Sequence, residues 1–313
     1  METPTAAKLI TKLKGHTDAV VALAFTPDRC LLATAGRDGV GRIWDVASSN
    51  PGERAKFTKT GDSFRSVAFS PNSRVLVAGT SAGLISMYDV TDKTATEVRV
   101  LRGGKGSIDA VAYSPDGKQV AGGGEDQTLR IWEPGVASSG DARSLLPGHT
   151  RPIRTIAFAP DGMTAATASL DTTARVWTLS RIRSSQKSSL PHGLGAISAA
   201  YSTDGKTLAT AGPDKVIRLW DLTAIKPTVR TELPSHPGGT RLVMMPPDGE
   251  SMVSVGEGNQ VINWNIRTGK PRLEWELPAG SVSSVALTLD GRYLARGMTD
   301  GTVEVYRVAE KRA

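Results

Sequence analysis

Short apolar runs in which small and large side chains alternate recur along the chain, and residues that favour turns separate these runs. Alternation with a period of two predicts strands, because successive side chains of a strand point to opposite faces. One aromatic residue returns at steps of 44, 44, 45, 43, 44 and 42 residues, at Trp44, Tyr88, Trp132, Trp177, Trp220, Trp264 and Tyr306. This spacing predicts a sevenfold repeat of strands, which no helical period explains.

Further columns of residues keep the same register. A turn residue lies sixteen positions before each aromatic: Asp28, Asn72, Asp116, Asp161, Asp204, Asp248 and Asp290. Asp and Asn hydrogen-bond their own backbone in turns, so we expect a hairpin at each of these positions. A small and then a large residue precede six of the seven turns, as in Ala24 and Phe25 or Ala157 and Phe158. Such alternation suits a strand that is crowded near a central axis, and each repeat reads as four short strands.

Composition agrees with short strands and tight turns. The chain has 33 Gly and 18 Pro among 313 residues, and aromatic residues make up only 5%. A net charge of +7 spread over this length favours acidic partners mildly and is not the concentrated footprint of a nucleic-acid binder. Cys30 is the only cysteine, so an internal disulfide cannot form. No apolar run reaches the roughly 18 residues of a membrane span, and no secretory leader is recognisable, so we expect no membrane association and a cytoplasmic location.

The motifs of the repeat resemble those of the WD40 family. They are LKGH at 13–16, IWDV at 43–46 and LATAGPDKVIRLWDL at 208–222, and the resemblance runs from about Lys8 to Val308, in the style of bacterial WD40 repeats. It implies an all-β fold, a closed seven-bladed β-propeller with four antiparallel strands per blade. We expect the single domain to span 1–313, with blades at approximately 14–56, 57–100, 101–145, 146–189, 190–232, 233–276 and 277–308.

The last blade needs an outer strand from the other end of the chain. After Tyr306 only RVAEKRA remains, which is too short and too charged for such a strand. The segment 8–13 (KLITKL) alternates polar and apolar residues and precedes blade one. As in the family, we expect 8–13 to complete blade seven and to remove the open strand edge.

Histidine, hydroxyl, carboxylate and indole groups recur in fixed columns. In WD40 propellers such residues form a hydrogen-bonded chain from Asp to His, from His to Ser or Thr, and from the hydroxyl to the Trp indole. Blades one, four and five have complete sets: His16, Thr34, Asp38 and Trp44; His149, Thr167, Asp171 and Trp177; His192, Thr210, Asp214 and Trp220. A satisfied buried polar chain rigidifies a blade, which is reason enough for its presence.

A hydrolase triad is the alternative interpretation of these sets. It is disfavoured because the same trio recurs in three blades and because no Gly-x-Ser-x-Gly elbow surrounds the hydroxyl. A metal site is disfavoured because each blade offers one histidine and no cluster of ligands. We therefore predict no catalytic residue, no metal and no cofactor. Blades two and seven lack the chain, and we expect them to rely on apolar packing and strand closure.

The resemblance also implies where a partner binds. In the family the commonest site is the top face, around the mouth of the central channel. Carrying its exposed columns onto this chain gives Arg37, Arg65, Ser81, Asp109, Glu125, Arg154, Leu170, Arg241 and Glu257. Four arginines among them suit an acidic or phosphorylated peptide, because guanidinium groups bind carboxylates and phosphates in two-pronged fashion. The alternative is that they are ordinary solvated charges of the rim.

These observations predict a monomeric, non-catalytic scaffold that binds peptides or other proteins at the top face. The alternative is a sensory or regulatory domain of a larger protein, such as a bacterial kinase or protease with attached WD40 repeats. A propeller enzyme or a nucleic-acid binder is less favoured. The basic stretch SRIRSSQKSSL at 180–190 is read as a flexible loop, since it has no aromatic residue on which a base could stack.

Overall fold

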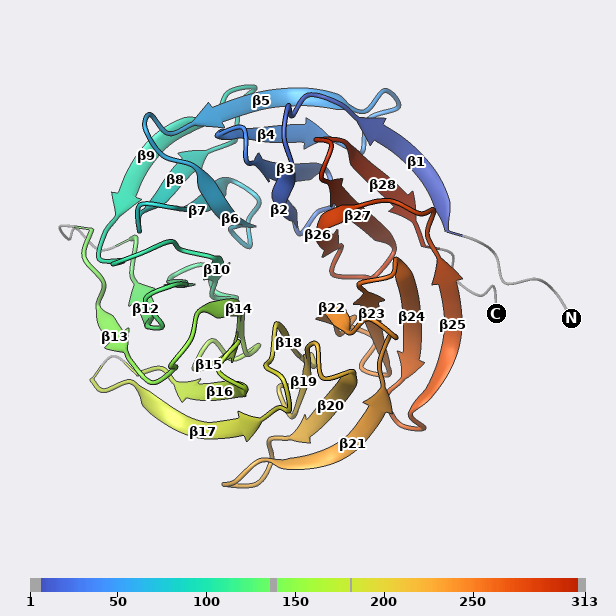
Figure 1. The fold of residues 1–313 in the computed structure, drawn as a ribbon. Coiled ribbons are helices and arrows are strands. Elements are labelled where there is room, and N and C mark those ends of the chain that lie inside the picture. The colour runs from blue at the N-terminus through green and yellow to red at the C-terminus, as the bar shows by residue number, and fades with distance from the viewer. Residues whose placement is uncertain (1–6, 136–139, 181, 309–313) are drawn as a thin grey trace, which may run out of the picture.

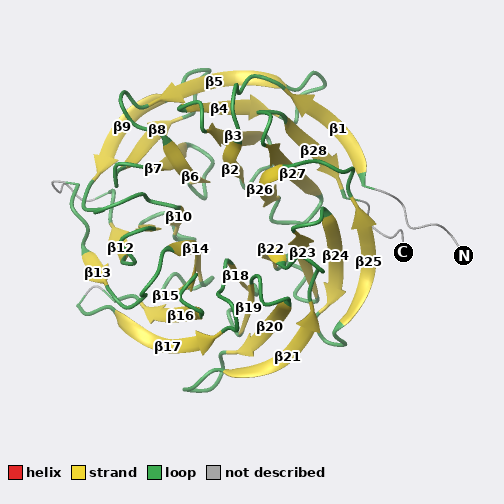
Figure 2. Ribbon diagram, viewed as in Figure 1, coloured by secondary structure: helices red, strands yellow, loops and turns green. Residues whose placement is uncertain are grey.

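Seven four-stranded antiparallel sheets stand around a central axis like the blades of a propeller (Figure 1). The computed structural model describes residues 7–135, 140–180 and 182–308. In six sheets the four strands follow one another in chain order from the axis to the outside, and in the seventh β26, β27 and β28 do so while β1 takes the outer place. The described part of the chain consists of strands and the loops that join them (Figure 2). The predicted all-β propeller is therefore confirmed.

The four strands of each blade have equivalent positions around the ring. The inner strands are β2 (Val20–Phe25), β6 (Phe64–Phe69), β10 (Ala110–Tyr113), β14 (Ile153–Phe158), β18 (Ser198–Tyr201), β22 (Thr240–Met244) and β26 (Val282–Leu287). The second strands are β3 (Leu31–Gly36), β7 (Val75–Thr80), β11 (Val120–Gly123), β15 (Thr164–Ser169), β19 (Thr207–Ala211), β23 (Ser251–Gly256) and β27 (Tyr293–Met298).

The third and outer strands complete the blades. The third strands are β4 (Val40–Asp45), β8 (Ile85–Asp89), β12 (Leu129–Trp132), β16 (Thr173–Thr178), β20 (Val216–Asp221), β24 (Gln260–Asn265) and β28 (Val303–Arg307). The outer strands are β5 (Gly52–Thr58), β9 (Thr96–Leu101), β13 (Ser144–Leu146), β17 (Ser185–Pro191), β21 (Thr228–Pro234), β25 (Lys270–Glu276) and, for blade seven, β1 (Lys8–Leu13). In blades one to five the outer strand ends one or two residues beyond the expected end of the blade.

The two ends of the chain meet in blade seven. Strand β1 pairs antiparallel with β28, from Lys8 opposite Arg307 to Leu13 opposite Val303. The sheet order β1-β28-β27-β26 confirms that the N-terminal strand closes the ring. Blade seven consequently has blade one as its neighbour. The outer edge of its third strand, β28, is paired with β1.

The hydrophobic core lies between neighbouring blades. Each cluster of buried apolar residues combines the third strand of one blade with the inner and second strands of the next; Ile43 of blade one, for example, packs with Phe69 and Leu76 of blade two. The seven aromatic residues of the repeat are all buried. The periodic column that predicted the fold is thus a column of core residues.

One predicted loop is a strand. Residues 185–191 form β17, although SRIRSSQKSSL at 180–190 was expected to be flexible. Leu190 explains the difference, because this one apolar side chain is buried against blade five while Ser185 and Lys187 remain exposed. Arg181 of the same stretch lies outside the described residues. A search of the described residues for a helix long and apolar enough to cross a membrane finds none.

Candidate functional site

The top face of the ring is the end that carries two loops of every blade. Because each sheet is an antiparallel meander, the loop that enters the inner strand and the loop between the second and third strands lie at the same end. All nine candidate binding residues fall in or beside these loops. The turns between the inner and second strands, which contain Asp28 and the equivalent residues of the other repeats, lie at the opposite end. We call this end the bottom face.

The pairing of the inner strands is irregular at their start, beside the top-face loops. The register between inner and second strands skips one residue in five blades: Val21, Arg65, Arg154, Arg241 and Ser283. A β-bulge re-aims the side chain of the extra residue and bends the strand. The sequence placed these residues in one column, but nothing in its alternation revealed the bulge.

Three of the candidates form one cluster across blades two, three and four. Asp109 Oδ1 lies 3.4 Å from Arg65 Nε, and Asp109 Oδ2 accepts a hydrogen bond of 3.2 Å from Arg154 Nη1. The Asp109 side chain is only 8% exposed, whereas those of Arg65 and Arg154 are 37% and 43% exposed. A nearly buried carboxylate therefore holds two guanidinium groups whose outer parts face solvent.

The loop of blade three supports this cluster. Ser107 Oγ donates a 2.8 Å hydrogen bond to Asp109 Oδ1, and the Ser107 backbone N–H donates to Glu125 Oε2 at 3.1 Å. Ser107 belongs to a neighbouring top-face column of the repeat, which the sequence predicts to be exposed, but it is buried. Its position two residues before Asp109 was the available signal, since a hydroxyl at that spacing reaches a following carboxylate.

The remaining candidates are not part of that cluster. Arg241 pairs with Glu257 and also donates to the backbone oxygen of Val282 at 3.0 Å. Ser81 donates to Asp62 within blade two, and Leu170 is half-buried. Arg37 is exposed; its backbone N–H donates to Ala19 O at 2.8 Å, and its side chain forms no hydrogen bond or ion pair with a described residue. Of the four candidate arginines, Arg65, Arg154 and Arg241 are paired with acidic side chains, and the side chain of Arg37 has no such partner among the described residues.

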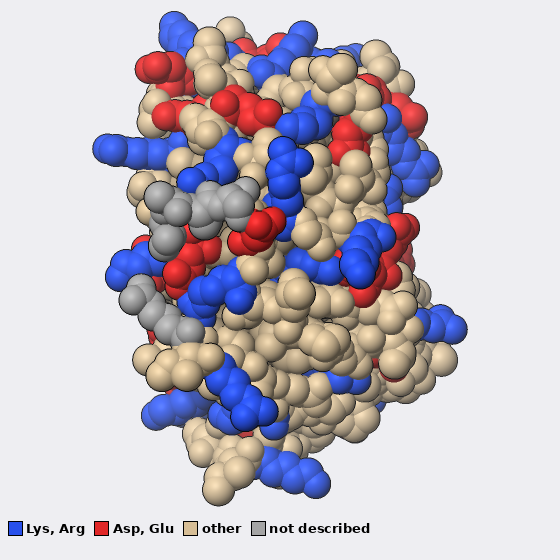
Figure 3. Space-filling view, turned by 90° about the vertical axis from the view of Figure 1, so that its left-hand side faces the viewer, with Lys and Arg blue, Asp and Glu red and all other residues tan. Residues whose placement is uncertain are grey.

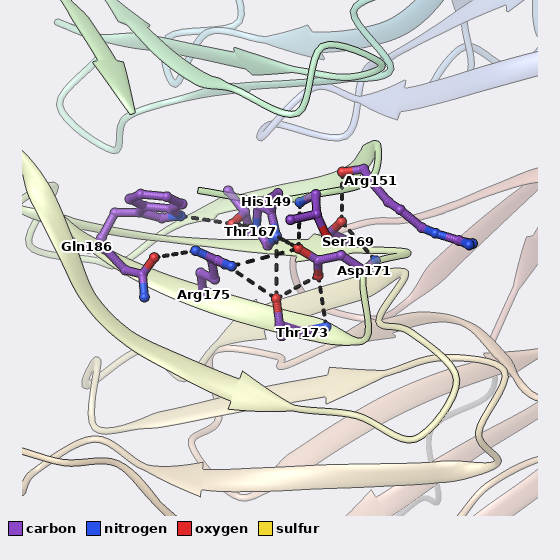
Figure 4. A network of polar contacts seen from close by, with 10 residues as sticks. His149, Arg151, Thr167, Ser169, Asp171, Thr173, Arg175 and Gln186 are labelled. Atoms are coloured by element: carbon purple, nitrogen blue, oxygen red, sulfur yellow. Dashed lines mark hydrogen bonds and ion pairs between the residues drawn. The ribbon is translucent and has the colours of Figure 1, made fainter. Parts of the chain in front are cut away.

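The predicted polar residues of blade four are joined into one chain (Figure 4). His149 Nδ1 lies 2.7 Å from Asp171 Oδ2, and His149 Nε2 lies 2.6 Å from Thr167 Oγ1. Trp177 Nε1 donates to the same hydroxyl at 2.8 Å. The chain runs from the top face into the core, and it connects strands β15 and β16 with the loop before β14 and with the loop between β15 and β16.

Blades one and five contain the same chain with one difference. In blade one His16 Nε2 lies 2.7 Å from Thr34 Oγ1, and His16 Nδ1 lies 3.0 Å from Asp38. In blade five Arg218 Nη1 stands 3.1 Å from His192 Nδ1, and the Asp214 oxygen is 3.4 Å away. A guanidinium can only donate, so His192 Nδ1 accepts there and its Nε2–H donates to Thr210, at 2.8 Å. Trp44 and Trp220 donate to the threonine hydroxyls at 2.9 and 2.7 Å.

Burial keeps these histidines neutral. It lowers the pKa of His149 although Asp171 acts in the opposite direction, and it lowers the pKa of His192 to about 4. The hydroxyls of Thr34, Thr167 and Thr210 belong to residues with no solvent exposure. A substrate could not reach these groups without opening the blade, so the chains have a scaffolding geometry. Within 7–135, 140–180 and 182–308, no group of three or more His, Cys, Asp or Glu residues could hold a metal ion.

Blade six has a fourth chain that the complete sets did not include. His236 Nε2 lies 2.9 Å from Ser254 Oγ, and Trp264 Nε1 donates to that oxygen at 2.8 Å. Gln260 Oε1, 3.1 Å from His236 Nδ1, stands in for the aspartate. Gly258 stands where other blades have the aspartate. Gln260 lies two residues further along the chain, at a position for which the repeat pattern predicts no acceptor.

Blade seven does not rely on apolar packing alone, contrary to expectation. Glu304 accepts hydrogen bonds of 2.7 Å from Arg296 Nε and from the Tyr306 hydroxyl, and Lys12 of β1 lies 2.8 Å from it. Burial alone would raise the pKa of Glu304, but Lys12, Tyr306 and Arg296 outweigh it and lower that pKa to about 2. Arg296 occupies the threonine column, and an ion-paired cluster replaces the histidine chain.

Blades two and three depart in other ways. Phe64 and Tyr88 of blade two pack against Phe57 of β5, the outer strand of blade one, with ring centroids 4.9 and 4.8 Å from that of Phe57, as expected for a blade built on apolar contacts. In blade three Asp126 forms a 2.6 Å ion pair with Arg130 in place of a histidine contact.

The closed ring and its polar chains define a β-propeller of the WD-repeat class. The family model described as "WD domain, G-beta repeat" matches residues 7–45, 54–89, 95–133, 140–178 and 184–221, which together are more than half of the chain. The chain therefore belongs to the WD40 repeat family, whose members commonly act as protein-interaction scaffolds. A comparison with curated proteins finds no significant match.

The matched segments are offset from the blades by one strand. The segment 54–89, for instance, holds most of β5, the outer strand of blade one, and the first three strands of blade two. Each repeat therefore links two neighbouring blades covalently. The residues after 221 lie outside the matched segments, yet they form two further blades of the same design.

Proposed function

We propose that this protein is a non-catalytic scaffold that binds a peptide or protein partner on its top face through the cluster of Arg65, Asp109 and Arg154. One observation carries the proposal: a nearly buried carboxylate anchors two half-exposed guanidinium groups on adjacent blades. The anchor restricts both arginines before a partner arrives, which reduces the entropy lost on binding. The buried position of the threonine hydroxyls favours a scaffold over a hydrolase.

The chemistry of the cluster favours an acidic or phosphorylated side chain as its ligand. Asp109 contacts Arg65 at Nε and Arg154 at Nη1, and these are the only ion pairs of the two arginines with described residues. The other N–H groups of each guanidinium are directed to solvent or to a partner, and guanidinium groups suit carboxylates and phosphates. Two positive charges against one negative charge leave the cluster electropositive.

The side of the ring that carries blades three and four gives no support to a nucleic-acid function. Lys and Arg side chains are scattered over the face shown, among Asp and Glu side chains in its upper part and separated by uncharged surface in its lower part (Figure 3). A binder of a phosphate backbone presents a continuous basic stripe instead. A discrete cluster at the mouth suits a single anionic side chain better than a polyanion.

Binding to an array of acidic and phosphorylated peptides tests this function, followed by fluorescence anisotropy of the peptides that bind. The double variant R65Q/R154Q removes both charges while retaining polar side chains. Charge-assisted hydrogen bonds are worth about 1.5–3 kcal/mol each, so Kd should rise by at least about tenfold, and more at low salt. The single variant D109N, which removes the anchor, should weaken binding less.

The double variant R74Q/R230Q is the matched control. Arg74 and Arg230 are exposed, lie away from the top-face loops and make no side-chain hydrogen bond with a described residue. Their replacement changes the net charge by the same amount and should leave Kd unchanged. If R65Q/R154Q retained the affinity of the wild type for every peptide bound, the proposed site would be wrong.

A further inference from the structure

One column of buried residues packs at the interfaces between neighbouring blades. The residue before each repeat aromatic is aliphatic in six blades, buried, and packed against the next blade: Ile43, Met87, Ile131, Val176, Leu219 and Val305. In blade six this position is Asn263, which belongs to none of the hydrophobic clusters. The joint between blades six and seven is therefore built differently from the other six.

The side-chain carbonyl of Asn263 has no hydrogen-bond partner among the described residues. Its Oδ1 is buried, and no described residue forms a hydrogen bond with either end of the side-chain amide. Asn263 lies in the middle of β24 and pairs with Val253 on one side and Leu273 on the other, so its backbone position is fixed. An unpaired buried carbonyl is unfavourable, and at the equivalent place six other blades have an aliphatic side chain.

A pocket of about 600 Å³ opens at this joint, with Asn263 in its lining. Apolar side chains surround the amide there: Val253, Leu273, Trp275 and Val308. The inner strands β22 and β26 pack less closely than any other neighbouring pair of inner strands. The volume is in the range of sites for small molecules. The lining is mixed, because polar and charged residues share it with these apolar side chains.

The charged groups of the lining already have partners. Arg272 pairs with Glu250 at 3.0 Å, and Asp290 pairs with Arg29 at 2.5 Å. Asp248 accepts 2.9 Å hydrogen bonds from the backbone N–H groups of Glu250 and Ser251. The polar group of the pocket that lacks a described hydrogen-bond partner is therefore a neutral amide, that of Asn263.

We propose that this pocket binds a small neutral molecule with an amide edge, such as a lactam or a primary carboxamide, attached to an apolar body. The C=O and N–H of such an edge can pair with the N–H and C=O of the Asn263 side chain, while the apolar body packs on Val253 and Leu273. This site is independent of the top-face cluster, because its turns, at Asp248 and Asp290, belong to the bottom face.

Ligand-observed NMR with two pairs of probes tests the proposal on the whole chain. The pairs are 2-piperidone against cyclohexanone, and benzamide against methyl benzoate, and each pair differs by the loss of the N–H donor. The amide probes should bind with a Kd on the order of 1 mM or below, as is reasonable for ligands of this size. Their partners without a donor should bind at least about tenfold more weakly, because they leave part of the Asn263 amide unpaired.

Two variants locate the binding. N263V introduces an aliphatic residue of the kind found at Val176 and Val305, and it should weaken amide binding at least about tenfold while raising the unfolding temperature. L219V makes a conservative change in the same column of blade five and should leave binding unchanged. The proposal is overturned if no amide probe binds the wild type, if N263V binds the probes as well as the wild type does, or if cyclohexanone binds as tightly as 2-piperidone. A rise in unfolding temperature without any probe binding would make Asn263 a solvated structural residue, and would also overturn it.

Discussion

At the scale of single residues, buried polar side chains stiffen the blades through hydrogen bonds. Their hydrogen-bond partners differ from blade to blade. His149 sits between Asp171 and Thr167, whereas His236 uses Gln260 and Ser254. Column spacing in the sequence was sufficient to name the residues of the first chain. It could not supply Gln260, because a longer side chain reaches the histidine from a different position.

The buried histidines make the stability of the fold depend on pH, and His192 shows the direction of this dependence. Its pKa is about 4 in the folded protein against 6.5 for the ordinary group, so between these values the unfolded chain binds a proton that the folded one does not. Stability is fully present above pH 6.5 and falls as the pH drops toward 4. The full effect for this one group is about 3 kcal/mol.

Urea unfolding between pH 7.5 and pH 4.5 measures this dependence. The range stays above the ordinary pKa of the aspartates, so their titration contributes little. H192Q should be less stable than the wild type at pH 7.5, yet it should lose less stability on acidification. An equal loss in both proteins would show that His192 is not neutral by burial.

At the scale of elements, alternation and turn residues predicted the strands, but not the details that place the site. The bulges at Arg65 and Arg154 depend on how inner and second strands twist against each other, which a single strand's pattern does not contain. Strand β17 was missed because only Leu190 marks its buried face. The closing strand β1 was predictable, since the C-terminal residues could not provide one.

The closing strand should contribute to stability through one ion pair as well as through its backbone. Lys12 of β1 reaches the largely buried Glu304 of β28. K12M should lower the free energy of unfolding by about 1 kcal/mol, because it removes one charge-assisted partner of a carboxylate that Arg296 and Tyr306 still hold. Deletion of 1–13 should destabilise the ring more, because it also exposes the edge of β28.

K8M is the control for this change, because Lys8 lies on the same strand and is exposed, and forms no ion pair with a described residue. Thermal unfolding followed by circular dichroism compares the three proteins. K8M should unfold with the wild type. The role given to Lys12 would be contradicted if K12M did so too.

At the scale of the whole molecule, the ring is a rigid support that presents loops from seven blades at one end. The sequence predicted this architecture because every repeat obeys the same register, and it predicted the residues of the top face by column. It did not predict that Asp109 gathers Arg65 and Arg154 while Arg241 pairs separately with Glu257. Those pairings depend on the distances between blades, which the closure of the ring sets.

Cross-linking mass spectrometry of the protein with a captured partner is the most direct test of top-face binding. Blade three offers a matched pair of exposed amines: Lys105 in the loop beside the cluster, and Lys118 in the turn at the bottom face. With an amine-reactive cross-linker, Lys105 should form most of the links to the partner, and these links should decline in R65Q/R154Q. Links that form mainly at Lys118, or that persist unchanged in R65Q/R154Q, would contradict the account.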